Sequence, residues 1–213
     1  VDAAARDGAK VVWFPTVDTV AAIKKTEHIE EGGRRPFWLD VLLSIQADGM
    51  ELKPVRILDD DGKLVPEAIE VLDVIARYNM ILATGHISVR EAKELIKVAK
   101  ERKVEKIICT HVDSQLCFWD IEDQIEYVKK YGVYMEHCSN SCTTGKVAWD
   151  VCLNQIKSIG CEHIIISTDL GQRKHKYPDE GLLNFANWML ENGISETDVR
   201  KTICENPKQL LFG

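Results

Sequence analysis

The sequence predicts an α/β protein built on a parallel β-sheet, with a (β/α)8 TIM barrel as the favoured architecture. Four apolar runs end in a potential metal ligand, namely His86, His111, His137 and Asp169, and these ends are 25, 26 and 32 residues apart (111−86, 137−111 and 169−137). This spacing suits strands that alternate with helices. The runs are continuously apolar, which is typical of parallel strands covered on both faces. No GxGxxG or GxxxxGK loop occurs, so the barrel is favoured over an open doubly wound sheet.

Local signals place the elements in chain order. From β-branched and aromatic runs bounded by turn residues we expect strands at residues 11–15, 55–58, 80–84, 105–110, 132–136 and 162–168. From apolar residues at helical spacing we expect helices at residues 18–25, 65–78, 88–102, 118–131, 146–158 and 179–191, and a last helix opened by Ser195. Ser88 and Glu91 form a capping box for one of these helices. The apolar stretch 37–45 is compatible with more than one type of element.

Length and composition limit the class of protein. With 213 residues, 45% of them hydrophobic, the chain can bury one sizeable core, so we expect a single domain over residues 1–213. The net charge is −7 and the basic residues are scattered, which argues against a nucleic-acid partner. No apolar run approaches the roughly 20 residues that cross a membrane. Seven cysteines without a secretory context fit a reducing compartment, so we expect a cytoplasmic protein without a membrane partner.

The polar residues that end the apolar runs predict a shared metal centre. The carboxyl ends of barrel strands converge on one site even when they are far apart in sequence. Strand alternation groups His86 with Leu82 and Thr84, His111 with Ile107 and Cys109, and Asp169 with Ile165 and Ser167. If each group faces the barrel axis, the three ligands meet. Imidazole and carboxylate groups suit zinc, with manganese, iron or nickel as alternatives, and Asp169 is also our candidate for moving the proton of an attacking water.

Three further residues and one ambiguity complete the predicted site. Glu136 and His137 are adjacent, so alternation allows only one of them to face the centre. We assign His137 as a metal ligand and Glu136 to substrate binding, although the sequence is equally compatible with the reverse. Gln172 and Arg173 lie in the polar loop after the last strand, where barrel enzymes shape the pocket for a small-molecule substrate.

These residues give the chain a resemblance to a known family. With "ATGH", "CTHVDS" and "STDLGQ" at three late strand ends and "ENPKQLL" near the end, the sequence resembles the amidohydrolase superfamily of metal-dependent hydrolases, and within it a branch that carries TGH and TDLGQ. The resemblance implies an eight-stranded barrel with metal-binding histidines on strands five and six and an aspartate on strand eight. His86, His111 and Asp169 occupy those places.

The resemblance also points to something missing. The family's first strand carries an HxH pair, and no HxH occurs in the 213 residues. Six strands are expected here, two fewer than eight. We therefore expect the C-terminal three-quarters of a barrel that lacks its first two strands, with the N-terminal segment supplied by a second chain or lost, and a homo-oligomer as the alternative.

The sequence thus predicts a metal-dependent hydrolase that cleaves an amide, lactam, lactone or ester bond of a small molecule by means of a metal-activated water. Phosphoester hydrolysis is the alternative within enzymology, because it uses similar sites. The alternative from another class is a non-catalytic subunit that completes a partner's barrel.

Overall fold

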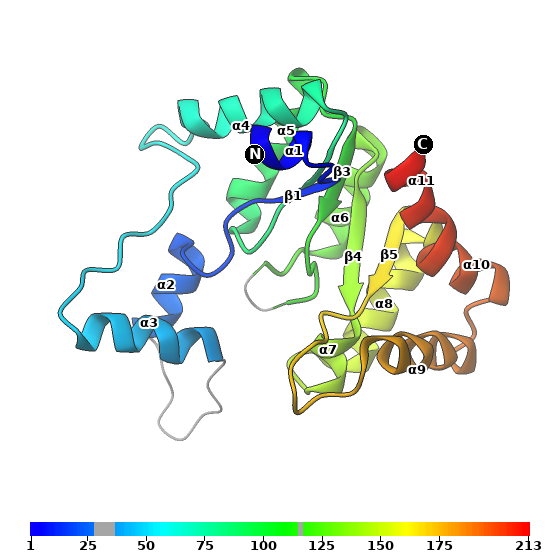
Figure 1. The fold of residues 1–213 in the computed structure, drawn as a ribbon. Coiled ribbons are helices and arrows are strands. Elements are labelled where there is room, and N and C mark those ends of the chain that lie inside the picture. Colours follow the sequence, from blue (N-terminus) through cyan, green and yellow to red (C-terminus); the bar gives the residue numbers. More distant parts are fainter. Residues whose placement is uncertain (28–36, 115–116) are drawn as a thin grey trace.

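The computed structural model describes residues 1–27, 37–114 and 117–213, which form an open parallel sheet with helices packed on it (Figure 1). Its five strands lie side by side in sequence order and are β1 (Val11–Trp13), β2 (Ile81–Ala83), β3 (Lys106–Cys109), β4 (Tyr134–Cys138) and β5 (Ile164–Ser167). All neighbouring pairs are parallel. The predicted α/β class with a parallel sheet is therefore confirmed.

The prediction of a (β/α)8 barrel is wrong, and so is its form without the first two strands. Within the described residues β1 pairs only with β2, and β5 only with β4, so the sheet stays open. The predicted strand at 55–58 makes only isolated bridges, from Val55 to Thr19 and from Leu58 to Leu64. Val55 bridges its partner in the parallel sense and Leu58 bridges a different partner in the antiparallel sense, so the segment forms no continuous ladder.

The helices agree more closely with the sequence. They are α1 (Asp2–Arg6), α2 (Val20–Glu27), α3 (Phe37–Ala47), α4 (Pro66–Arg77), α5 (Val89–Glu101), α6 (Ile121–Tyr131), α7 (Ser139–Thr143), α8 (Trp149–Ile159), α9 (Pro178–Glu191), α10 (Glu196–Arg200) and α11 (Asn206–Phe212), with a 3-10 turn at Cys161–His163 and a π-helical turn at Lys201–Glu205. The capping box of α5 is confirmed, because Ser88 Oγ accepts from Glu91 N–H at 3.3 Å and Ser88 N–H donates to Glu91 Oε2 at 2.9 Å. The apolar stretch 37–45, whose type of secondary structure the sequence left open, is part of the helix α3.

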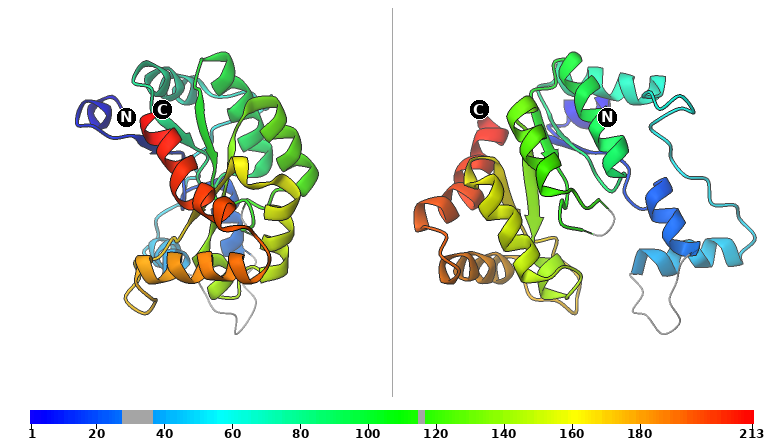
Figure 2. Two further views of the ribbon diagram at one scale, coloured as in Figure 1. Left: turned by 90° about the vertical axis from the view of Figure 1, so that its right-hand side faces the viewer. Right: turned by 180° about the vertical axis from the view of Figure 1, so that it is seen from behind.

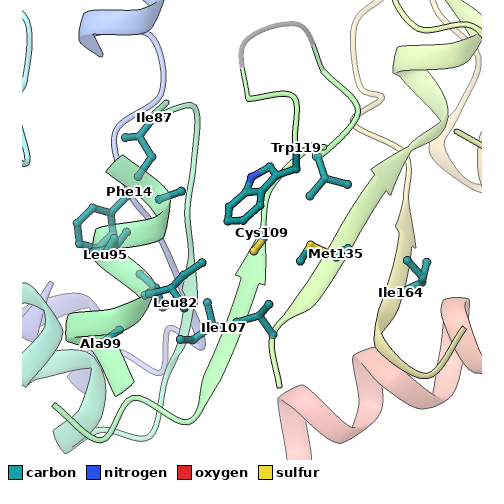
Figure 3. Packing of buried hydrophobic residues seen from close by; sticks show 14 of the residues in the cluster. Phe14, Leu82, Ile87, Leu95, Ala99, Ile107, Cys109, Trp119, Met135 and Ile164 are labelled. Carbon is teal, nitrogen blue, oxygen red and sulfur yellow. The ribbon is translucent and has the colours of Figure 1, made fainter. Parts of the chain in front are cut away.

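The main core lies between the sheet and the helices on one of its faces. Leu82, Ile107, Met135 and Ile164 lie on successive strands (Figure 3), and they pack against apolar residues of the helices in one cluster. The opposite face carries a smaller cluster, namely Ile81, Ala83, Ile108, Ile165 and Leu210 of α11. The sheet is therefore unequally covered, and the burial of its strands comes mainly from the helical face.

Two parts of the chain lie at the edges of this arrangement. Helices α2 and α3 stand apart from the sheet and are joined to α4 by a long segment (Figure 2). The arrows of β4 and β5 point toward α7, so α7 marks the carboxyl edge of the sheet (Figure 1).

Among the described helices, none combines the length and the apolar character that crossing a membrane requires.

Candidate metal centre

A glycine places His86 at the carboxyl end of β2. Gly85 has a φ of 66°, and a Cβ atom at this position would lie 2.2 Å from the carbonyl oxygen of Phe14. Glycine adopts this backbone conformation without a steric penalty, so the chain can turn against β1. The N–H of His86 then donates to the carbonyl of Pro15 at 3.0 Å. The glycine of the TGH motif is therefore explained by close approach to the backbone of the neighbouring segment.

Two threonine hydroxyls extend the pairing of β2 and β3 beyond the strands. The N–H of Thr110 donates to Thr84 Oγ1 at 2.9 Å, and the N–H of Gly85 donates to Thr110 Oγ1 at 3.1 Å. Both threonines are buried. The hydroxyls take the place of backbone partners at the point where His86 and His111 leave the sheet.

His111 and Asp169 share an uncommon backbone conformation. Four described residues other than glycine have a positive φ, and two of them, Asn79 and Lys103, follow the ends of helices. The other two are His111 (φ 51°) and Asp169 (φ 50°), which follow β3 and β5 at the same edge of the sheet. Such conformations cost free energy and cluster at functional sites. This edge of the sheet is therefore a candidate functional site.

The left-handed conformation of His111 also corrects the prediction that was based on strand alternation. Leu82, Ile107 and Cys109, which were expected to face the same centre as the ligands, lie in the core on the helical face, whereas Ile165 lies in the cluster on the opposite face. The three groups therefore do not share a face. His111 does not follow Ile107 and Cys109 into the core, because its positive φ interrupts the strand alternation.

The strand ends bring His86 and His111 together. Their ring centroids are 5.1 Å apart. Burial, with a smaller contribution from the nearby His111, lowers the pKa of His86 to about 4, and Asp169 opposes this shift. His86 is therefore a neutral imidazole at physiological pH, which is the form that binds a metal ion.

A network of polar side chains joins His111 to β4 and β5. His111 Nδ1 is 3.4 Å from Glu136 Oε2 and 3.0 Å from Cys138 Sγ. Ser167 Oγ donates to Glu136 Oε1 at 2.9 Å and is 2.8 Å from Cys138 Sγ. Burial and the charge of Glu136 raise the pKa of the Cys138 thiol well above its ordinary value. Without a metal ion this thiol is neutral, so the contact with His111 does not form a thiolate nucleophile.

The structure answers the question of Glu136 and His137. Glu136 lies with His111, while His137 is completely buried and its Nδ1 is 3.0 Å from Asp113 Oδ2. His137, assigned from the sequence as a ligand of this centre, is therefore on the other side of β4. Glu136, assigned to substrate binding, occupies a position suited to a ligand.

The remaining predicted residues lie in the loop after β5. Asp169 is exposed, and Asn140 Nδ2 donates to its Oδ2 at 3.0 Å. Gln172 and Arg173 are also exposed, a few residues further along the same loop. Asp169 is thus held at the rim of the cluster, while Gln172 and Arg173 lie further out.

Sequence reasoning gave no role to three residues of this site, namely Cys138, Asn140 and Ser167, although it placed Ser167 on the same face as Asp169. The alternation of β4 contains a signal for one of them, because Cys138 follows Glu136 by two residues and so shares its face. The sequence gives no comparable signal for Asn140, which acts on Asp169 across 29 residues.

The donor set fits a divalent ion such as zinc. One ligand atom each of His111, Glu136 and Cys138 lies within 4.8 Å of the other two, and the neutral His86 is beside them. Imidazole, carboxylate and thiol are the groups that bind zinc in proteins. We call this set, together with Asp169, the candidate metal centre.

Comparison with known families places the chain. A family model described as "Family of unknown function (DUF6282)" matches residues 1–136. The chain belongs to this family. The matched region contains His86, His111 and Glu136 and ends before Cys138 and Asp169. Comparison with curated proteins gives no match.

Proposed function

We propose that this protein is a metal-dependent hydrolase that cleaves an amide, lactam, lactone or ester bond of a small molecule. The observation that supports the proposal is the meeting of His86 and His111 with Glu136 and Cys138 at one edge of a parallel sheet. In sheets of this kind ligands bind outside the carboxyl ends of the strands. The motifs that resemble the amidohydrolase superfamily contribute two of these residues, His86 and His111, and Asp169 at the rim.

Each residue has a distinct part in the proposed reaction. His111, Glu136 and Cys138 would hold the ion, with His86 as a further ligand. A bound zinc ion would polarise the scissile carbonyl and lower the pKa of a coordinated water toward about 7. Asp169 is exposed and its Oδ2 is fixed by Asn140, so its carboxylate can accept the proton of the attacking water and deliver it to the leaving group.

Solvent access separates this centre from a structural site. The side chains of His111 and Glu136 are 16% and 12% exposed while Cys138 is buried, so the centre borders solvent on the side of His111 and Glu136. A catalytic ion needs an open coordination position, whereas structural sites are closed. The exposed Gln172 and Arg173 in the adjoining loop are proposed to contact the substrate once it is bound.

The test combines metal analysis with a panel of substrates. Amide, lactam, lactone, ester and phosphoester substrates are offered to the zinc-loaded chain and to Asp169→Asn. We expect hydrolysis of one of the carbonyl classes, and a loss of about 10²- to 10⁴-fold in kcat/KM in the variant, the usual contribution of a general acid–base residue. Asp179→Asn, an exposed aspartate in the first turn of α9, is the matched control and should keep full activity.

Two results would contradict the proposal. One is a chain that binds no divalent metal ion at the candidate metal centre, seen as equal metal content in the wild type and in His111→Asn. The other is an Asp169→Asn variant as active as the wild type. Hydrolysis of phosphoesters alone would instead support the alternative prediction, a phosphoester hydrolase.

A further inference from the structure

A second group of metal-ligating side chains lies inside the molecule, on the helical side of β4. Its members are Asp113 from the loop after β3, His137 on β4, Cys142 on α7 and Cys152 on α8. All four are buried. We call them the buried cluster. The elements β4, α7 and α8, which carry three of these residues, come together at this end of the sheet (Figure 1).

The distances within the buried cluster are those of ligands around one ion. His137 Nδ1 is 3.0 Å from Asp113 Oδ2 and 3.6 Å from Cys152 Sγ, and the three ligand atoms lie within 4.8 Å of one another. Around a tetrahedral zinc ion, a nitrogen and an oxygen are about 3.3 Å apart and a nitrogen and a sulfur about 3.6 Å, as follows from the usual bond lengths. A small opening of the His137–Asp113 contact would therefore admit the ion.

Cys142 supplies a fourth donor. Its thiol lies beside that of Cys152, and a hydrogen bond between the two is the largest cause of the raised pKa of Cys152. Cys142 therefore lies next to the group formed by Asp113, His137 and Cys152 and is the candidate for a fourth ligand. Four protein donors complete a tetrahedral shell and leave no position for water or substrate, which is the pattern of a structural zinc site.

An unpaired polar atom is the second observation. Among the residues that the structure describes, Asp113 Oδ1 is buried and has no hydrogen-bond partner. The side chain of Asp113 is 0% exposed. A carboxylate removed from water in this way is costly unless a cation or a full set of hydrogen bonds stabilises it. Oδ2 has His137 as its partner and the Cys152 thiol also lies close to the carboxylate, but Oδ1 is left unpaired, so the set is incomplete.

We propose that the buried cluster binds a structural zinc ion through Asp113, His137, Cys142 and Cys152. This ion is separate from that of the candidate metal centre. It ties β4 to α7 and α8, so it holds the segment from Glu136 to Asn140, which carries two ligands of the open site and the partner of Asp169. The proposal does not depend on the proposed hydrolase activity.

The first experiment leaves the buried cluster intact. Cys138→Ser removes the thiol of the candidate metal centre, and the purified variant is then loaded with cobalt(II) in place of zinc. We expect absorption from thiolate-to-cobalt charge transfer, because Cys142 and Cys152 still supply sulfur ligands. Absence of this absorption in a folded Cys138→Ser chain would overturn the proposal, whatever the substrates hydrolysed by the wild type.

The second experiment assigns the ligands. In the Cys138→Ser background, Cys142→Ser and Cys152→Ser together should abolish the charge-transfer absorption and remove about one tightly bound zinc ion per chain, as expected for a single structural site. Cys109→Ser changes another fully buried thiol, on β3, and should change neither reading. Absorption that survives the loss of both cysteines would contradict the assignment.

The two proposals fail independently. His86→Asn and Asp169→Asn alter the candidate metal centre and should leave the zinc of the buried cluster in place. A chain with zinc in the buried cluster and no ion at the open edge would refute the hydrolase and leave the structural site standing. A chain with the reverse pattern would do the opposite.

Discussion

The candidate metal centre and the buried cluster share one strand and similar residue types, yet they differ in access to solvent. Glu136 and His137 are neighbours on β4 and their side chains point to opposite faces. Glu136 contacts His111 at the edge of the sheet, and its side chain is 12% exposed. His137 contacts Asp113 in the interior, and both of these side chains are 0% exposed. Histidine, carboxylate and thiol groups thus occur on both sides of the same strand, a few ångströms of backbone apart.

The comparison shows that exposure, more than residue type, decides what such a group can do. At the open edge a ligand position can be taken by water or substrate, which chemistry requires. In the interior the same donors can form hydrogen bonds only with each other or bind an ion, and both kinds of contact stabilise the fold. The predictions below test this division of roles.

The largest expected effect is on stability, and it separates the two groups. Asp113→Ala leaves His137 Nδ1 buried without its hydrogen-bond partner, so in the metal-free chain we expect a loss of up to about 3 kcal/mol in the free energy of unfolding. Glu136→Ala acts on a side chain that water reaches, and we expect about 1 kcal/mol. Urea unfolding of both variants measures the difference. Equal losses would show that the two sides of β4 are energetically alike.

The pH dependence of stability should report on His86. Its pKa is lowered to about 4 by burial and by His111, below the value near 6.5 in the unfolded chain. Between these values the unfolded state binds a proton that the folded state does not, so stability is fully present above about pH 6.5 and is lost as the pH falls toward 4, by on the order of 2 kcal/mol.

Unfolding of the chelator-treated wild type and of His86→Asn, compared between pH 7 and pH 4.5, measures this contribution. The variant lacks the titrating group, so its stability should fall less over this interval. Curves that stay parallel for the two proteins would mean that His86 is not the cause.

The smallest effect concerns the cap beside the open centre. Ser88→Ala removes the hydroxyl that accepts from Glu91 N–H, and we expect about 1 kcal/mol of destabilisation, the usual value for an N-cap. Ser195→Ala removes the equivalent contact to Asp198 N–H in α10, away from both groups, and is the matched control for stability. Thermal unfolding compares the two. A loss several times larger at Ser88 would indicate that the cap also supports His86, two residues before it.

Local sequence signals predicted the elements of the fold well, and the closure of the sheet poorly. The capping box at Ser88 and Glu91 could be read directly, because it depends on residues three apart. Closure depends on how many strands pair and on whether the first meets the last, which periodicity does not encode. The apolar run 55–58 looked like a strand for the same reason, since only its surroundings prevent it from pairing.

The site shows the same limit at the level of side chains. His86, His111 and Asp169 could be selected because each ends an apolar run. The positive φ of His111 could not be predicted from the sequence, because residues other than glycine adopt a positive φ only uncommonly. The pairing of His137 with Asp113 depends on a contact across 24 residues, so the choice between Glu136 and His137 needed the tertiary structure.

The hydroxyls of Thr84 and Thr110 link the two segments that leave the sheet after β2 and β3. Because each accepts from the backbone of the opposite segment, the two loops that start there are fastened to one another just below the imidazole rings. The backbone segments that carry His86 and His111 are therefore linked to one another beyond the last paired residues of the two strands. Replacing either threonine by valine, which keeps the shape but not the oxygen, would remove one of these two links.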